Sequence, residues 1–330
     1  MQHQKTSQLY DKHMAAAFYQ ERYAHGYMDD WPIEKKRRIF EVIHNFDLPD
    51  TGEALDFGCG NGVFTDVIKQ ALPAGWKIYG TDISEIAIEN AKKRYPGYVF
   101  FMPDDREFIS KRFDFLFTHH VLEHVYNLPQ VLKEINDCLK DKSTMLHILP
   151  CGNEGSFEHS ICLLRKDGIN LQLENRFFFE DEGHVRRLTT EQLSKLCREK
   201  GFILAKEYYS NQYFGAIDWI IQSGLSFIRM VTNVSSAVDE KAKSKLTKIR
   251  YKLLFLWGSR YLATFFDSRL RKRGRTVRNY IALILGLPLY AFTKSLNNYL
   301  KVKVLNEWNK QKTERNGSEM YLFFKRSQIA

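Results

Sequence analysis

Short apolar runs alternate with stretches of helical periodicity from Glu53 to about Tyr208. The apolar runs predict strands at 53–57, 77–81, 98–102, 113–118, 144–149 and 202–209. The stretches between them predict helices at 61–72, 84–94, 128–139 and 189–200. Strands that alternate with helices are typical of βαβ units and a mostly parallel sheet. We therefore predict an α/β, doubly wound fold for this part of the chain.

Residues at the ends of these elements support the prediction. Ser84 is expected to be an N-cap, and Pro129 is tolerated in a first helical turn. The run Thr189–Gln192 has the pattern of a capping box, and Gly201 is expected to be the C-cap of the same helix. Pro150 should end the fifth strand.

The last strand of the sheet is predicted far from the others. Met320 to Phe324 is an apolar run about 110 residues after the sixth strand, and the intervening stretch reads as helical, aromatic and basic. Residues 151–188 show no clear period and are expected to form an insertion over the active face. The predicted organisation is an N-terminal helical cap at 1–50, a core at 51–212, a helical insert at 213–312 and a final strand returning to the core at 313–330.

Composition narrows the class of protein. The chain has 330 residues, with 44% hydrophobic and 27% charged, as in ordinary globular proteins. Its five cysteines are scattered and show no C-x-x-C spacing, which favours a reduced compartment. The N-terminus is polar and lacks the apolar core of a signal peptide. We therefore expect a cytoplasmic location.

Charge is distributed unevenly along the chain. Residues 1–240 carry 28 Lys and Arg against 35 Asp and Glu, a net −7, whereas 241–312 carry 18 against 2, a net +16. Three apolar runs lie in or beside the basic region, and a dense basic cluster occupies 269–275. The runs cover 213–231, 251–266 and 280–292.

The basic insert at 213–312 is expected to rest on an anionic membrane surface. Its third apolar run has 13 residues without a charge, and a helix needs about 20 to span a bilayer. Basic and apolar side chains on one helix suit the interface instead, which would place the protein peripherally on the inner face of the membrane. Alternatively, the apolar faces pack on one another as a cap over an acceptor site. Binding of nucleic acid is the third interpretation of the insert: its charge would allow it, but its apolar content argues against it.

Three glycines, Gly58, Gly60 and Gly62, follow a predicted strand and open a predicted helix. Glycines there permit a tight turn and close approach of a ligand, as also in dinucleotide-binding proteins. The spacing here is G-x-G-x-G, however, and Asp56 precedes the first glycine. Its carboxylate would repel a pyrophosphate but attract an ammonium group. S-adenosylmethionine carries an ammonium group and no phosphate, so it fits this loop.

Two further acidic residues extend this ligand-binding pattern. Asp82 ends the second strand, 20 residues beyond Gly62, where a carboxylate can accept hydrogen bonds from ribose hydroxyls. The alternative is an acid in the first turn of the next helix. Asp104 follows the third strand and could accept a bond from an adenine amino group, although Asp105 beside it could take that role.

These segments together resemble class I S-adenosylmethionine-dependent methyltransferases, in particular the group that includes the ubiquinone-biosynthesis O-methyltransferases. The resemblance covers about residues 35–210 and 319–326. It implies a seven-stranded, Rossmann-like sheet whose last strand inserts between the fifth and sixth. The segments that carry it are Leu55–Gly62, Thr81–Ile83, Pro103–Asp104, Phe113–Phe115, Val121–Val125 and Gly183–Thr189.

The resemblance also implies roles for single residues. Asp56, Gly58 and Gly60 would hold the methionine end of the cofactor, and Asp82 would hold the ribose. Ile83 would pack on the adenine and Asp104 would bond its amino group. His119, directly after the fourth strand, would lie beside the sulfonium.

Several histidines are candidates for catalysis or metal binding. His120 to His124 matches the H-x-x-E-H pattern of some zinc proteases, but the surrounding strands already explain the segment. Some ubiquinone-type relatives are thought to bind a divalent metal through Glu-x-x-Glu-His, and His120 stands where the first Glu would be. Because hard cations prefer carboxylates, we expect no metal.

We expect His120 or His184 to be the general base of the reaction. Both are predicted in loops at the carboxyl ends of strands, where ligands bind in such sheets. His147 lies inside a predicted strand and is expected to be buried structure. Arg186 and Arg187 could hold an anionic acceptor, with at least one of them exposed to solvent.

The favoured function is therefore methyl transfer from S-adenosylmethionine, to a hydroxyl of a small-molecule, saccharide or lipid-linked acceptor. A nicotinamide-dependent oxidoreductase on a similar fold is one alternative, disfavoured by Asp56 and the short glycine spacing. A non-catalytic, membrane-associated adaptor is another. The joint presence of Asp56, Asp82 and Asp104 argues against the adaptor.

Overall fold

The computed structural model describes residues 12–27, 29–271 and 277–327. The chain divides into two compact units. The first contains residues 1–150, 182–207 and 320–330, and the second contains 151–181 and 208–319. Each unit is described by itself.

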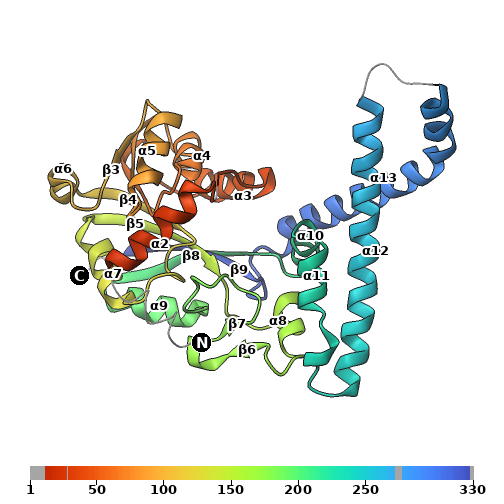
Figure 1. Ribbon diagram of the computed structural model, residues 1–330. Coiled ribbons are helices and arrows are strands. Elements are labelled where there is room, and N and C mark those ends of the chain that lie inside the picture. The colour runs from red at the N-terminus through yellow and green to blue at the C-terminus, as the bar shows by residue number, and fades with distance from the viewer. Residues whose placement is uncertain (1–11, 28, 272–276, 328–330) are drawn as a thin grey trace. The chain divides into compact units, whose positions relative to one another are not determined.

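A seven-stranded sheet forms the centre of the first unit (Figure 1). Strands β1 with β2 and β4, β2 with β3, and β4 with β5 pair in parallel. The last strand, β9, lies between β5 and β8, which confirms the predicted doubly wound fold and the place of its final strand. In spatial order the strands are β3 (Val99–Phe101), β2 (Gly75–Thr81), β1 (Thr51–Phe57), β4 (Phe113–His119), β5 (Leu139–Pro150), β9 (Glu319–Arg326) and β8 (Phe202–Ser210).

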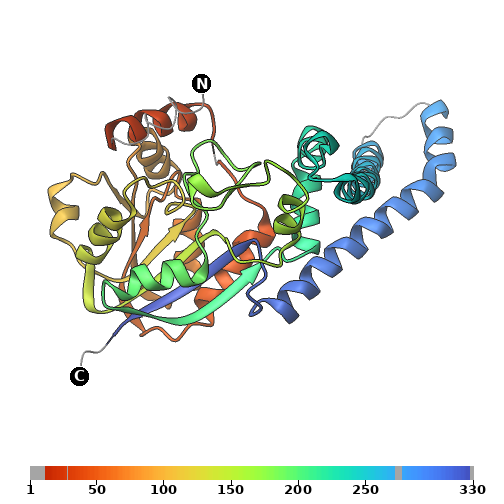
Figure 2. The same ribbon diagram turned by 90° about the horizontal axis from the view of Figure 1, so that it is seen from below.

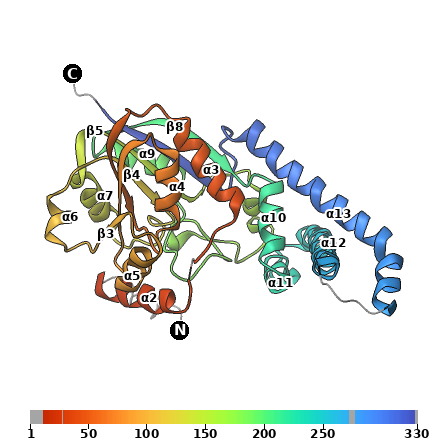
Figure 3. The same ribbon diagram turned by 90° about the horizontal axis from the view of Figure 1, so that it is seen from above.

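Helices cover both faces of this sheet (Figures 1 and 3). One face carries α3 (Ile33–His44), α4 (Val63–Ala71) and α5 (Glu85–Arg94). The other carries α6 (Arg106–Ser110), α7 (Leu128–Asp137) and α9 (Thr190–Arg198). Because both faces are covered, a central strand is apolar on both sides: β4 buries all but one of its residues. Helix α2 (Lys12–Ala24) precedes α3 and packs beside α5.

Most predicted helix ends are confirmed. The Ser84 hydroxyl accepts a bond from the Ala87 N–H at 3.2 Å, and Thr189 and Gln192 form the expected capping box. One detail was wrong: α9 ends at Arg198 with Glu199 as its C-cap. Gly201, with φ +82°, instead turns the chain into β8. Only glycine adopts this backbone conformation at little cost, so the residue type remained a sound signal for the turn.

The second unit is mainly helical. It contains α8 (Phe157–Cys162), the short strands β6 (Ile169–Asn170) and β7 (Arg176–Phe177), α10 (Phe214–Gln222), α11 (Leu225–Val231), α12 (Glu240–Arg271) and α13 (Val277–Gln311). Within the described residues, no helix is both long enough and apolar enough to cross a membrane.

The stretch 151–181 groups with this helical unit, although 51–212 was expected to be one core. The reason lies in packing. Phe157 and Ile161 of α8 belong to the same buried cluster as Ile217, Ile220 and Leu253 of the later helices. The lack of periodicity in 151–181 hid this membership, because the other residues of the stretch that pack against the cluster, Leu164, Phe178 and Phe179, lie outside any helix.

Candidate active site

The glycine loop between β1 and α4 has the backbone geometry of a ligand cradle. Gly58, Gly60 and Gly62 all have positive φ, at 77°, 51° and 77°. A side chain at Gly58 would collide with Val121, and one at Gly60 would lie 2.6 Å from the Tyr23 hydroxyl. The Gly58 N–H bonds the carbonyl of Thr81 at 2.8 Å, which fixes the loop to the end of β2. Glycine is therefore required here on two grounds, conformation and space.

Asp56 is buried at the end of β1, with 1% of its surface exposed. Burial raises the pKa of its carboxyl group to about 7, although a 2.7 Å bond from the Thr65 hydroxyl favours the ionised form and nearby Asp82 disfavours it. A carboxyl group poised in this way gains from a cationic ligand, as expected for the ammonium end of the cofactor.

Asp82 lies at the end of β2 and ties two loops together. One carboxylate oxygen accepts the Gly60 N–H and the other accepts the Ser84 N–H, both at 2.9 Å. Burial raises the pKa of Asp82, and these backbone bonds oppose the increase. Each oxygen has a second lone pair, so the carboxylate can still accept hydrogen bonds from two ribose hydroxyls. The alternative of an acid in the first helical turn was wrong, because α5 begins at Glu85 after the N-cap Ser84. The ribose role of Asp82 stays a prediction.

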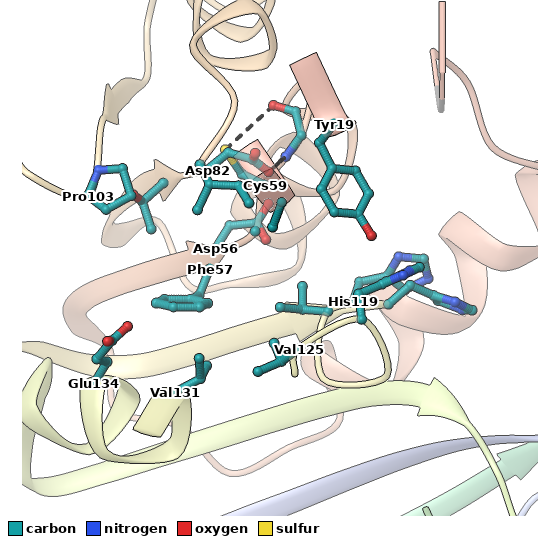
Figure 4. A pocket seen from close by; sticks show the side chains of 18 of the residues that line it. Tyr19, Asp56, Phe57, Cys59, Asp82, Pro103, His119, Val125, Val131 and Glu134 are labelled. Carbon is teal, nitrogen blue, oxygen red and sulfur yellow. Dashed lines mark hydrogen bonds between the residues drawn. The ribbon is translucent and has the colours of Figure 1, made fainter. Parts of the chain in front are cut away.

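A cavity of about 640 Å³ opens over this loop. In Figure 4, Tyr19 and His119 lie at one end, Pro103 and Glu134 at the other, and Asp56 and Asp82 between them. Its volume suits a ligand of the size of S-adenosylmethionine. All its lining residues belong to the first unit.

The predicted cofactor residues differ in how they meet this cavity. Gly58, Gly60, Ile83 and His119 line it. Asp104 is exposed, and the wall at this point is formed by its neighbour Pro103. One carboxylate oxygen of Asp105, the alternative, accepts a hydrogen bond from the Met102 N–H at 2.9 Å. Neither carboxylate lines the cavity, so the choice between Asp104 and Asp105 stays a prediction.

Aromatic residues from the N-terminal segment form part of the cavity wall that sequence reasoning missed. Tyr19, Tyr23, Tyr27 and Trp31 all line it. Tyr23 is so deeply buried near Asp82 that the pKa of its hydroxyl rises well above the usual value. A signal was present, because these four aromatic residues recur at every fourth position, although only Tyr19 and Tyr23 lie within α2.

A cluster of histidines surrounds one buried carboxylate after β4. The His120 Nδ1 lies 2.9 Å from Oε1 of Glu123, whose side chain is completely buried. The other His120 nitrogen, Nε2, lies 3.2 Å from the Lys35 ammonium group. The His124 ring packs against that of His184, with centroids 4.5 Å apart. His120 and His124 line the cavity, so the cluster borders the space above the cofactor loop.

Electrostatics hold this cluster in a defined charge state. Burial disfavours the ionised form of Glu123, but His120, His124 and His184 outweigh it and lower its pKa to about 2. Burial lowers the pKa of His124 to about 4. Near neutral pH, Glu123 is therefore an anion and His124 is neutral.

His120 itself has an unusual backbone. Its φ is +53°, and its N–H donates to the Ile148 carbonyl at 2.9 Å. A residue other than glycine rarely adopts this conformation, and such strain is concentrated at functional sites.

Three other sequence expectations can be compared with their positions. Arg186 and Arg187 are 6% and 2% exposed, so the expectation that at least one is solvent-exposed was wrong. The Arg186 guanidinium donates to the carbonyls of Leu122, Val125 and Tyr126 and thereby holds the loop after β4. His147 is fully buried as predicted, and its Nδ1 bonds the Thr118 hydroxyl at 2.8 Å.

The side-chain atoms of His120, Glu123 and His184 that could coordinate a metal ion lie within 4.8 Å of one another. A metal ion could bridge that spacing, and the two nitrogens and one carboxylate would suit a borderline cation better than magnesium. The same geometry is explained by the short bond between His120 and Glu123.

Comparison with known proteins agrees with this geometry. Residues 24–207, more than half of the chain, match a family model described as a methyltransferase domain. The chain belongs to this family of methyltransferases, and its cofactor is S-adenosylmethionine. The oxidoreductase alternative is thereby overturned, while the narrower resemblance to the ubiquinone-biosynthesis group stays a prediction.

Individual relatives are more distant. A trans-aconitate 2-methyltransferase of Variovorax paradoxus is 32% identical over 71 residues, which are 22% of this chain and 27% of that protein. An uncharacterized methyltransferase of Schizosaccharomyces pombe is 25% identical over 46% of this chain and 62% of its own length. The chain thus covers less than two thirds of either relative.

Among solved structures, the phosphoethanolamine N-methyltransferase 2 of Haemonchus contortus, in complex with S-adenosyl-L-methionine, is 13% identical. Its TM-score is 0.44, and the match covers 90% of this chain and 53% of that one.

Proposed function

We propose that the protein transfers the methyl group of S-adenosylmethionine to a hydroxyl oxygen of a small-molecule, saccharide or lipid-linked acceptor. The observation that carries the proposal is the pair formed by His120 and Glu123 at the cavity wall. An amine acceptor would need less help, because its lone pair is available once it is neutral. A hydroxyl must lose a proton as the carbon–oxygen bond forms, so it benefits from a base.

The proposed base is His120, and Glu123 is its positioning residue. The Glu123 carboxylate lies 2.9 Å from Nδ1, so we assign the proton of the neutral ring to Nδ1, and Nε2 then keeps its lone pair. The ammonium group of Lys35 donates to this same nitrogen. An acceptor hydroxyl would replace Lys35 as the donor to Nε2, and the Glu123 anion would stabilise the imidazolium that forms.

His184 is the weaker of the two predicted bases. The His184 ring packs on that of His124 and does not line the cavity. His184 helps to lower the pKa of Glu123. We therefore assign it a supporting role in holding Glu123 ionised.

The methyl group itself comes from the cofactor, which supplies the leaving group as its sulfonium. The protein holds donor and acceptor in line, a contribution of roughly 7–11 kcal/mol in well-oriented reactions. His119 lies at the end of the cavity nearest the histidine cluster, its ring 4.1 Å from that of Phe64. This position supports its assignment beside the sulfonium.

The test has two stages. A transfer assay with labelled cofactor, run against separated lipid and soluble fractions of a cell extract, identifies the acceptor. The His120→Gln variant should then lose about 10²–10⁴-fold in kcat, while its affinity for S-adenosylhomocysteine stays unchanged. His25→Gln, at an exposed position on the N-terminal segment, is the matched control.

Two outcomes would contradict the assignment. An unchanged rate and pH profile in His120→Gln would remove His120 as the base. Activity that is lost on chelation and restored by a divalent metal would show that His120, Glu123 and His184 act as ligands instead. We expect chelation to leave the rate unchanged.

A further inference from the structure

The second unit contains two long helices, α12 and α13 (Figure 1). Both expose large apolar side chains. Leu285 on α13 is 77% exposed, although a leucine is ordinarily among the most buried residues. Single exposed leucines are common, but a dense group of them marks a surface that meets another apolar phase. The group comprises Tyr251, Phe255, Tyr261, Phe265, Ile284, Leu285, Leu287, Leu289 and Phe292.

The same helices carry a positive charge that nearby acidic residues do not offset. Residues 241–312 contain 18 Lys and Arg but only two acids. Asp267 is occupied within the unit by Lys294 and Tyr290, both at 2.6 Å. Glu307 is also occupied, because its carboxylate accepts the N–H groups of residues 213–215 at the start of α10. The 18 basic residues therefore greatly outnumber the acids that could neutralise them, although Arg260 pairs with Asp218.

Apolar and basic residues follow a definite order in the sequence from the end of α12 through α13. The basic stretch 269–278 comes first, the uncharged run 280–292 second, and Lys294, Lys301 and Lys303 third. Pro288 stands inside this uncharged run, where it removes a backbone hydrogen bond and bends the helix. The bend is visible in Figure 2. An uncharged, bent segment between two basic ones is suited to shallow insertion among lipid headgroups.

Other partners fit this surface less well. In a symmetric dimer, a C2 axis would place the basic flanks of one copy against those of the other, and like charges in an interface are repulsive. Nucleic acid would use the Lys and Arg residues. It would leave Ile284, Leu285 and Leu287 in water.

We propose that the surface of α12 and α13 binds the headgroup region of an anionic phospholipid bilayer. The apolar segment Ile284–Phe292 inserts at the boundary between the lipid headgroups and the acyl chains. The flanking Lys and Arg residues contact lipid phosphates. This proposal concerns the second unit alone and stands whether or not the acceptor is a lipid.

Vesicle cosedimentation of the full chain tests the proposal. The protein should bind phosphatidylcholine vesicles that contain phosphatidylglycerol, should bind pure phosphatidylcholine weakly, and should be released by salt. The variant R269Q/R271Q/R273Q should weaken binding by about fivefold for each removed charge. The variant L285E/L287E should weaken it by about tenfold or more, because two inserted side chains become charged.

The matched control is Leu171→Glu, which places the same charge at a leucine of the second unit that is 78% exposed and lies outside α12 and α13. It should bind vesicles like the unaltered protein. Calorimetry with S-adenosylhomocysteine should give the same affinity for every variant, which separates this test from that of the proposed function.

The proposal is overturned if the protein stays in the supernatant with anionic vesicles at low salt. It is also overturned if Leu171→Glu weakens binding as much as L285E/L287E. Sedimentation velocity supplies a third criterion: a dimer that dissociates on L285E/L287E substitution would identify a second copy as the partner.

Discussion

Asp82 ties the glycine loop to the start of α5, and we propose that it also binds the ribose of the cofactor. Its carboxylate accepts the Gly60 and Ser84 N–H groups and faces the cavity. Asp82→Ala should weaken S-adenosylhomocysteine binding by about 1.5–3 kcal/mol, because hydrogen bonds to a charged group are lost. Titration calorimetry measures this directly, with the exposed Asp47→Ala as the control.

The loss in Asp82→Ala could also arise from the loop, since Gly60 would lose its partner. Asp82→Asn separates the causes: its single carbonyl oxygen can keep one backbone bond but cannot accept from both ribose hydroxyls. We expect an affinity between those of the other two proteins. An unchanged affinity in folded Asp82→Ala would disprove the ribose assignment.

Single residues differ in how far the sequence could reveal them. The glycines were recognisable because the turn after β1 requires positive φ angles. Asp56 was recognisable because a carboxylate beside that turn favours a cationic ligand over a phosphate. The pairing of His120 with Glu123 was not, because the chain after β4 folds back with a positive φ at His120.

Elements were predicted where periodicity alone decides them. The strands up to β4 and the helices α5 and α9 appeared close to their expected places, since their apolar faces repeat regularly. β5 begins at Leu139, five residues before the expected strand, because its first residues are mostly polar. These polar residues lie in an irregular part of the pairing, between Leu139, which pairs with Phe113, and Thr144, which pairs with Phe115.

The pairing of β4 with β5 contains a buried histidine, which makes the sheet sensitive to acid. Burial lowers the pKa of His147 to about 3, and its ordinary value is 6.5. Between these values the unfolded chain binds a proton that the folded protein does not, so stability falls as pH decreases. His147 alone should contribute about 1.4 kcal/mol per pH unit over that range.

His147→Asn should reduce this slope. The asparagine amide can keep the bond to Thr118 but has no proton to gain, so the difference between the two proteins isolates His147 from His124 and Asp56. Urea unfolding at several pH values between 4 and 7 measures the slope. Equal slopes would mean that His147 is protonated in both states or in neither.

At the scale of the whole molecule, the cavity and the apolar, basic surface lie in different units. All the residues that line the cofactor cavity lie in the first unit, and the apolar, basic surface lies in the second. Composition indicated this division, because the change from −7 to +16 in net charge falls within the second unit. It could not place 151–181, whose membership depends on packing between distant segments.

This division predicts where a ligand stabilises the protein. A ligand present at 100 times its dissociation constant stabilises the folded state that binds it by about 2.7 kcal/mol. S-adenosylhomocysteine should therefore slow amide hydrogen exchange in the first unit, most strongly in α2 and in the loop from Gly58 to Gly62. It should leave exchange in α12 and α13 unchanged, because neither helix contributes to the cavity wall. Anionic vesicles should have the reverse effect, protecting α12 and α13 and not the glycine loop. Protection of both units by either ligand alone would show that the two functions are energetically coupled.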